Sequence, residues 1–149
     1  MCHAEKALNY FDNGSNCAQS VLAAYAEEFG LDQEMALRIA ACFGGGIANR
    51  GRTCGAVCGA LMIIGLQYGN TDPENAQARE KKYASIQQFM DGFTACHHST
   101  ICRELLGCDL ANPEGRQCAQ EQNLFSTCCP PLIRTATELL DQLLEQSVK

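Results

Sequence analysis

The sequence has no long hydrophobic run, no cluster of basic residues, and no alternation of apolar and polar residues typical of β-strands. Its longest apolar stretch, residues 56–66, is too short to span a bilayer and is interrupted by glycine, so no membrane insertion is expected. The formal net charge of −6 disfavours a nucleic acid or an anionic membrane surface as the main partner. These absences favour a soluble helical protein.

Signatures of common enzymes and nucleotide-binding proteins are also missing. The glycine-rich segment Gly44-Gly45-Gly46 has neither the Walker spacing with lysine nor the GxGxxG pattern after a strand, which excludes both common phosphate-binding loops. The Asp, Glu and Ser residues form no nucleophile–base–orienter set, so no hydrolase is indicated. No CxxCH motif is present, which excludes covalently attached c-type haem.

Cysteine is abundant, with 11 in a chain of 149 residues. A chain of this length forms one domain, residues 1–149, and can bury a sufficient core without disulfides. Because the N-terminal residues show no apolar signal region, we expect a cytoplasmic location. In a reducing compartment, many cysteines indicate metal binding or redox chemistry. Any one cysteine is equally consistent with a small buried apolar residue.

The spacing of apolar residues predicts an all-α protein, a single-domain bundle of about six to seven helices. Capping residues, glycines and prolines set the expected ends. The segment 109–127 is the least regular, and Pro130 and Pro131 are expected to open the last helix. The expected helices cover residues 4–11, 15–29, 32–43, 54–68, 72–95, 99–106 and 130–143.

Four cysteines fall at the expected N-termini of four of these helices: Cys17, Cys54, Cys102 and Cys129. Free backbone N–H groups and the helix dipole at such positions favour a thiolate over a thiol, which predicts a lowered thiol pKa. Thiolate is the form that binds a metal or attacks a disulfide. If the fold brings the four ends together, they form the ligand set that both zinc and iron–sulfur clusters use.

Glycines accompany these cysteines in the segments 44–46 and 51–60. Glycine costs roughly 1 kcal/mol in a helix interior, so its presence at residues 55 and 59 requires a reason. Gly45, Gly55 and Gly59 are candidate cofactor-binding residues, because they allow backbone to approach a bulky group closely. Close helix packing is an equally good explanation.

Short motifs follow one another in order along the chain: Gly14-Ser15-Asn16-Cys17-Ala18-Gln19, Phe43-Gly44-Gly45-Gly46, Thr53-Cys54-Gly55-Ala56-Val57, Ile64-Gly65-Leu66, Tyr68-Gly69, Asp72-Pro73, Cys102-Arg103-Glu104-Leu105-Leu106-Gly107 and Cys129-Pro130. With these motifs the chain resembles the C_GCAxxG_C_C family of redox-active proteins over nearly its whole length. The family's cysteines correspond to the four at the expected helix ends, and the family is similar to a domain of split-Soret cytochromes c that carries an iron–sulfur centre. The resemblance implies a cysteine-bound iron–sulfur site ([2Fe–2S] or [4Fe–4S]) or redox-active thiols.

The chain departs from this pattern at two places. The family name spells Gly-Cys-Ala where this chain has Cys54-Gly55-Ala56, and Cys58 stands where threonine is expected. Cys58 lies four residues after Cys54 on one helix face, so it is a fifth candidate metal ligand, a spare thiol or a core residue. Four of the other cysteines, at residues 42, 96, 108 and 118, have no capping context and are interpreted as ordinary small residues. The adjacent His97 and His98 are interpreted as exposed loop.

Three functions follow from these observations. The first is an iron–sulfur protein that transfers electrons to or from a partner oxidoreductase. The second is a thiol–disulfide or peroxide-reducing enzyme that uses a reactive cysteine pair, although no CxxC stands at a helix start. The third is a structural zinc protein, although zinc sites of four cysteines usually show CxxC pairs. The sequence leaves open whether the chain forms a homodimer.

Overall fold

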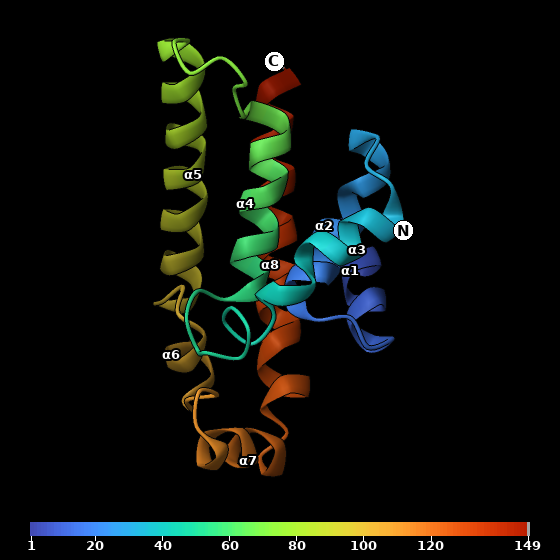
Figure 1. Ribbon diagram of the computed structural model, residues 1–149, viewed down its shortest axis with the longest axis vertical. Coiled ribbons are helices and arrows are strands. Elements are labelled where there is room, and N and C mark those ends of the chain that lie inside the picture. Colours follow the sequence, from blue (N-terminus) through green and yellow to red (C-terminus); the bar gives the residue numbers. More distant parts are fainter. Residues whose placement is uncertain (149) are drawn as a thin grey trace.

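Eight α-helices and two short 3₁₀ helices, η1 and η2, make up most of residues 1–148, the part of the chain that the computed structural model describes (Figure 1). The only β-type pairing among these residues is an isolated bridge between Thr53 and Ile101. The predicted all-α class is therefore confirmed, with one helix more than expected. The helices are α1 (His3–Asp12), α2 (Cys17–Tyr25), η1 (Ala26–Phe29), α3 (Gln33–Ala40), η2 (Ala41–Phe43), α4 (Gly55–Tyr68), α5 (Ala76–His97), α6 (Cys102–Leu106), α7 (Pro113–Glu121) and α8 (Leu124–Val148).

Three helices, α4, α5 and α8, pack against one another and run along the long axis of the molecule (Figure 1). Helix α2 packs against α4 on one flank of this layer, and α1 and α3 pack against α2. Helices α6 and α7 lie at the lower end of Figure 1, where both contact α8. The core lies between α2, α4, α5 and α8, and its largest fully buried side chains include Tyr25, Phe89, Phe93, Ile63 and Leu140.

Helix α2 is fixed to α8 by a polar contact inside this core. The hydroxyl of Tyr25 donates to the carboxylate of Asp141 at 2.7 Å and lies 3.0 Å from the carbonyl of Thr137. The ring of His3, in α1, stacks on Tyr25 with 3.9 Å between ring centroids and lies 2.7 Å from the same carboxylate. These contacts give α1, α2 and α8 fixed relative positions, because a buried polar group is costly to leave without its partner.

The last helix begins earlier than the sequence predicts. Pro130 and Pro131 do not open it but lie inside α8, which starts at Leu124. A proline removes one helical N–H donor, so here the carbonyls of Ser126 and Thr127 lose their partners. Both residues are exposed and close to the start of the helix, where water can replace the missing donors. The helix therefore tolerates both prolines.

The extra helix is α7, in the segment expected to be the least regular. Asn112 caps it by accepting a hydrogen bond from the backbone N–H of Gly115 at 2.7 Å, and Pro113 occupies its first position. Asparagine followed by proline is a known helix-start signal, so the sequence does contain evidence for α7. Its apolar residues are too few to give a clear periodicity.

Gly59 allows helices α2 and α4 to approach closely. A Cβ atom on Gly59 would lie 2.8 Å from the carbonyl oxygen of Ala18 and 3.0 Å from the Cβ of Val21. The same helix contains Gly65, where a Cβ would meet nothing within 4 Å. Only the first of these two glycines is therefore required by packing.

We expect Gly59→Ala and Gly65→Ala to change stability in opposite directions. Gly59→Ala should lower the free energy of unfolding by about 1–3 kcal/mol, because α2 and α4 must move apart. Gly65→Ala should raise it by up to roughly 1 kcal/mol, because alanine favours the helix. Denaturant unfolding of the two variants tests this, and an equal loss in both would contradict the packing role given to Gly59.

Candidate functional site

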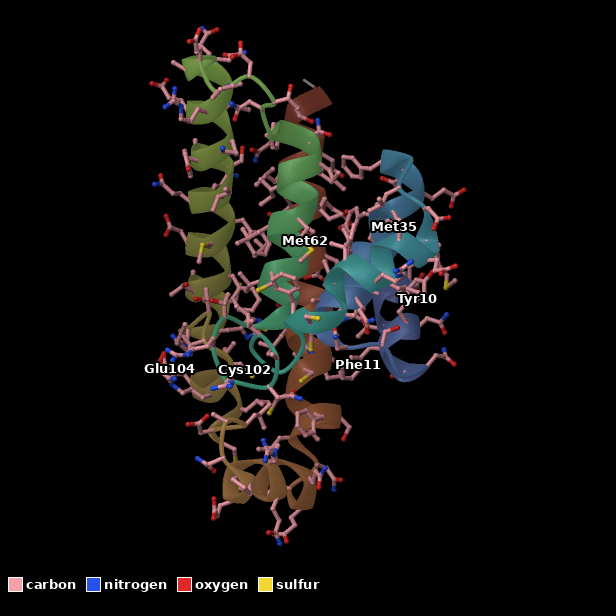
Figure 2. All side chains as sticks on the ribbon, in the orientation of Figure 1. Tyr10, Phe11, Met35, Met62, Cys102 and Glu104 are labelled. Atoms are coloured by element: carbon pink, nitrogen blue, oxygen red, sulfur yellow. The ribbon has the colours of Figure 1, made fainter. Side chains whose placement is uncertain are left out.

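All four cysteines that the sequence placed at helix ends line one cavity of about 460 Å³. Cys17 comes from α2, Cys54 precedes α4, Cys102 begins α6 and Cys129 lies in α8. Figure 2 labels two lining residues, Phe11 and Cys102, which lie at the same level on opposite sides of α8. The four thiols are nearly inaccessible to solvent, with exposed fractions of 3–9%. The fold thus brings together four cysteines that are far apart in the sequence.

The rest of the cavity wall is apolar side chain and backbone. Its large side chains are those of Phe11, Leu105, Leu106, Leu110, Phe125 and Leu132. The segments 14–16 and 44–49 supply small and amide-bearing residues, and no charged side chain lines the cavity within the described part of the chain. The thiols therefore face a space with little to stabilise an isolated negative charge.

Cys17 is positioned by the cap of α2. The Asn16 side chain accepts a hydrogen bond from the backbone N–H of Gln19 at 2.8 Å, and the Gln19 side chain accepts one from the Asn16 backbone N–H at 3.0 Å. This reciprocal arrangement is a capping box, and it fixes the first turn of the helix. The Asn16 side chain also donates to the carbonyl of Ala41 at 3.0 Å. The cap therefore ties the position of Cys17 to the start of η2.

Cys54 and Cys102 are joined by a short backbone pairing. The backbone N–H of Cys54 donates to the carbonyl of Thr100 at 2.8 Å, and that of Cys102 donates to the carbonyl of Arg52 at 2.6 Å. The isolated bridge between Thr53 and Ile101 lies between these two bonds. Two thiols separated by 48 positions in the numbering are thereby held on adjacent backbone.

The loop before Cys54 has an unusual backbone. Every residue from Gly45 to Asn49 has a positive φ, between 52° and 71°. For Ile47 and Ala48 this conformation costs about 1–2 kcal/mol each, and it is rarest for a β-branched residue such as Ile47. The surrounding hydrogen bonds maintain it, including those from the N–H groups of Gly51 and Arg52 to the carbonyls of Gly45 and Gly46. Residues 44–46, 48 and 49 of this left-handed turn line the cavity.

Gly46 and Gly55 allow the backbone to pack around the thiols. A Cβ on Gly46 would lie 2.5 Å from the backbone nitrogen of Arg52 and 2.6 Å from the Cβ of Cys102. A Cβ on Gly55 would lie 3.1 Å from the Cβ of Cys17 and 3.0 Å from the nitrogen of Ala18. These positions require glycine because the thiol-bearing segments approach one another closely.

Burial and the interaction between Cys17 and Cys129 determine the thiol pKa values, contrary to the expectation from helix ends. Burial raises the pKa of Cys54 to about 11 although the backbone N–H groups of Ala56 and Val57 oppose it, and burial raises that of Cys102 to about 12. The hydrogen bond with Cys129, followed by burial, places the pKa of Cys17 well above its usual range. The same hydrogen bond lowers the pKa of Cys129. The one thiol with a lowered pKa is thus inside a helix and not at its end.

The other predicted site residues have different positions. Gly45 and Gly55 line the cavity, but Gly59 does not and instead packs against α2. Cys58 is buried one turn beyond Cys54, outside the cavity, with its sulfur 3.8 Å from the carbonyl of Thr53. Within residues 1–148 no three His, Cys, Asp or Glu side chains lie close enough together to hold one metal ion. The cavity thiols are distributed around its wall.

Two cysteines interpreted as ordinary small residues are in contact with each other. The sulfur atoms of Cys108 and Cys118 lie 2.9 Å apart, away from the cavity wall. The two histidines lie at the end of α5, where His97 contacts the hydroxyl of Thr135 at 2.7 Å, and neither lines the cavity. The sequence gives no sign of the cysteine contact, because it depends on the turn between α6 and α7.

Comparison with known proteins identifies the family. The family model described as "Putative redox-active protein (C_GCAxxG_C_C)" matches residues 15–143. This chain belongs to the C_GCAxxG_C_C family. The matched range contains all four cavity thiols, whereas Phe11 of the cavity wall precedes it. Neither the curated proteins nor the solved structures include a match.

This C_GCAxxG_C_C chain has no helix among residues 1–148 that is both long enough and apolar enough to cross a membrane. The expectation that no segment inserts as a membrane-spanning helix agrees with this finding. The longest helices are α5 and α8, and both contain charged residues, in α8 from Arg134 onward.

We expect Gly46→Ala to disturb the site more than Gly30→Ala, which provides a matched control. Both residues have a positive φ, 71° and 65°, so both variants lose about 1–2 kcal/mol from backbone strain. Only the Cβ at residue 46 overlaps other atoms, whereas that at residue 30 meets nothing within 4 Å. Gly46→Ala should therefore lose about 1–3 kcal/mol more and expose Cys102.

The measurements are thermal unfolding and the rate of alkylation at Cys102, followed by mass spectrometry. Faster alkylation in Gly46→Ala alone is the expected result. Equal unfolding temperatures and equal alkylation rates in both variants would contradict the role given to Gly46.

Proposed function

We propose that this C_GCAxxG_C_C protein is a redox protein that binds an iron–sulfur cluster through Cys17, Cys54, Cys102 and Cys129. The observation that carries the proposal is that these four thiols, from four separate segments, line a single cavity. Four cysteine ligands are the usual set for both [2Fe–2S] and [4Fe–4S] clusters. The family description, redox-active, supports the same class of function.

The residues present fit such a cofactor in two respects. The donor set is four thiols with no carboxylate or imidazole among the lining residues, which matches the preference of iron–sulfur clusters for sulfur. Gly46 and Gly55 let backbone approach the thiols where a side chain would overlap other atoms. When bound, a cluster would supply a reversible one-electron carrier and the positive charge that these buried thiolates otherwise lack.

The protein's own residues would hold and shield the cofactor. The capping box at Asn16 orients Cys17, the backbone pairing orients Cys54 and Cys102, and α8 orients Cys129. Leucine and phenylalanine side chains would form the apolar part of the wall around it. The left-handed turn forms one wall, and its residues Ala48 and Asn49 are exposed on the outside. We propose this turn as the place where an oxidoreductase partner approaches and exchanges electrons.

A single zinc ion fits the arrangement less well. Structural zinc requires four ligands gathered about one ion at about 2.3 Å, commonly supplied by CxxC pairs. The cavity thiols come from four separate segments and are distributed around a volume of about 460 Å³. A cluster has several iron atoms, so its cysteine ligands are bound at separated points.

One observation favours a second candidate, a thiol–disulfide enzyme. Cys17 and Cys129 both line the cavity, and the interaction with Cys17 lowers the pKa of the Cys129 thiol. A thiol of lowered pKa beside a second thiol is the arrangement of an attacking and a resolving cysteine. In this alternative the pair acts without a metal, and Cys54 and Cys102 are not required.

Metal analysis distinguishes these functions. Protein purified without oxygen should contain iron and acid-labile sulfide in matching amounts and show a brown visible spectrum. Cys54→Ala should lose most of its iron, because it removes a cavity thiol. Cys58→Ala is the matched control and should keep it, because Cys58 is a buried cysteine of the same helix that does not line the cavity.

Equal iron content in the two variants would contradict the ligand assignment. Protein that contains zinc and no iron would support the alternative of a structural zinc protein. Metal-free protein in which Cys17 and Cys129 form a disulfide would support the thiol enzyme.

A further inference from the structure

A second pair of thiols lies outside the cavity, between the end of α6 and the middle of α7. Cys108 follows α6 by two residues, and Cys118 is the sixth residue of α7. Their sulfur atoms are 2.9 Å apart, with the thiol of Cys108 donating to the sulfur of Cys118. Neither residue lines the cavity of the four-thiol site. This contact is therefore separate from the proposed cluster ligands.

The turn between α6 and α7 holds the two sulfur atoms together. Gly107 ends α6 with a positive φ of 74°, and Asn112 caps α7. A Cβ on Gly115 would overlap the backbone of Asp109, so α7 packs directly on the segment that carries Cys108. Leu110 and Ala119 are almost fully buried and anchor the turn and α7 to the core. The contact is thus fixed from both sides.

The two thiols differ in environment. Cys108 is buried, with an exposed fraction of 8%, whereas Cys118 is half-buried and more accessible. The sulfur of Cys118 accepts two hydrogen bonds, one from Cys108 and one from the side-chain amide of Gln122 at 3.2 Å. A small disulfide in solution reaches the half-buried sulfur of Cys118 more readily than the buried sulfur of Cys108. Cys118 is therefore assigned as the nucleophile and Cys108 as the resolving thiol.

We propose that Cys108 and Cys118 form a reversible disulfide, a second redox site that exchanges with small disulfides. The Cys118 thiolate attacks one sulfur of the disulfide, forming a mixed disulfide and releasing one small thiolate. Cys108, after its proton passes to solvent, attacks the Cys118 sulfur, forming the internal disulfide and releasing the second thiolate. Two protein thiols lose two electrons and two protons, and one small disulfide is reduced to two thiols.

The proposal does not depend on a cluster in the cavity. A bond between residues 108 and 118 would close only a short loop and join the end of α6 to α7.

The other nearby thiol is Cys128, which lies close enough to Cys108 to affect its pKa. It is the competing partner that the test must distinguish.

The test uses the full chain, purified without oxygen and treated with 2-hydroxyethyl disulfide. Peptide mapping without reduction should find the peptides of Cys108 and Cys118 linked, with the mass of two hydrogens lost. Cys108→Ser should instead accumulate a stable mixed disulfide on Cys118, because the resolving thiol is absent. Cys118→Ser should leave Cys108 reduced. Cys96→Ser removes an exposed cysteine and should form the internal disulfide as the wild type does.

Three results would overturn the proposal. The first is a stable mixed disulfide on Cys118 in the wild-type protein. The second is a disulfide from Cys108 or Cys118 to Cys128. The third is that Cys108 and Cys118 both stay reduced although the exposed cysteines have reacted with 2-hydroxyethyl disulfide. Iron content measured on the same samples separates this test from that of the cluster. Cys108→Ser and Cys118→Ser should retain wild-type iron, and a metal-free protein that still forms the disulfide would contradict only the cluster.

Discussion

The backbone pairing between residues 52–54 and 100–102 is the contact on which the site depends. It joins the segment before α4 to the start of α6. Its hydrogen bonds are donated by the backbone N–H groups of Cys54 and Cys102, two of the cavity cysteines. Because the chain between these segments runs up α4 and back along α5, the packing of those two helices determines whether the pairing forms (Figure 1). The core of the bundle is thereby connected directly to the position of two cavity thiols.

This arrangement has a cost in stability. Ile47 and Ala48 are held in a left-handed conformation, and each costs about 1–2 kcal/mol. Burial also raises the pKa of Cys54 and Cys102, so the folded protein holds these thiols in a place that disfavours their charged form. Strained backbone and buried titratable groups are concentrated at functional sites, where the surrounding structure holds them in place. Both features occur around the same cavity.

The sequence predicts much of this site because helix starts are encoded locally. Caps and glycines were sufficient to place Cys17, Cys54 and Cys102 near helix starts, although α2 begins at Cys17, with Asn16 as its cap, and not at residue 15. The prolines after Cys129 led to a wrong helix start. Proline is compatible with the first turn of a helix, and also with a later position where water can bind the carbonyls that have lost their N–H donors. The raised pKa values and the Cys108–Cys118 contact were beyond prediction, because both depend on burial and on distances between segments.

The two groups of thiols share one structural support, the short helix α6. Cys102 is its first residue, and Cys108 lies two residues beyond its end. A five-residue helix has too little intrinsic stability to hold a position alone, so its place depends on what is attached at each end. The pairing with Arg52 holds its start, and the contact of Cys108 with α7 and the burial of Leu106 and Leu110 hold the other end. A change in bonding at Cys108 therefore acts on α6, the helix that positions Cys102 at the cavity. The five residues of this helix connect the Cys108–Cys118 pair with the four-thiol site.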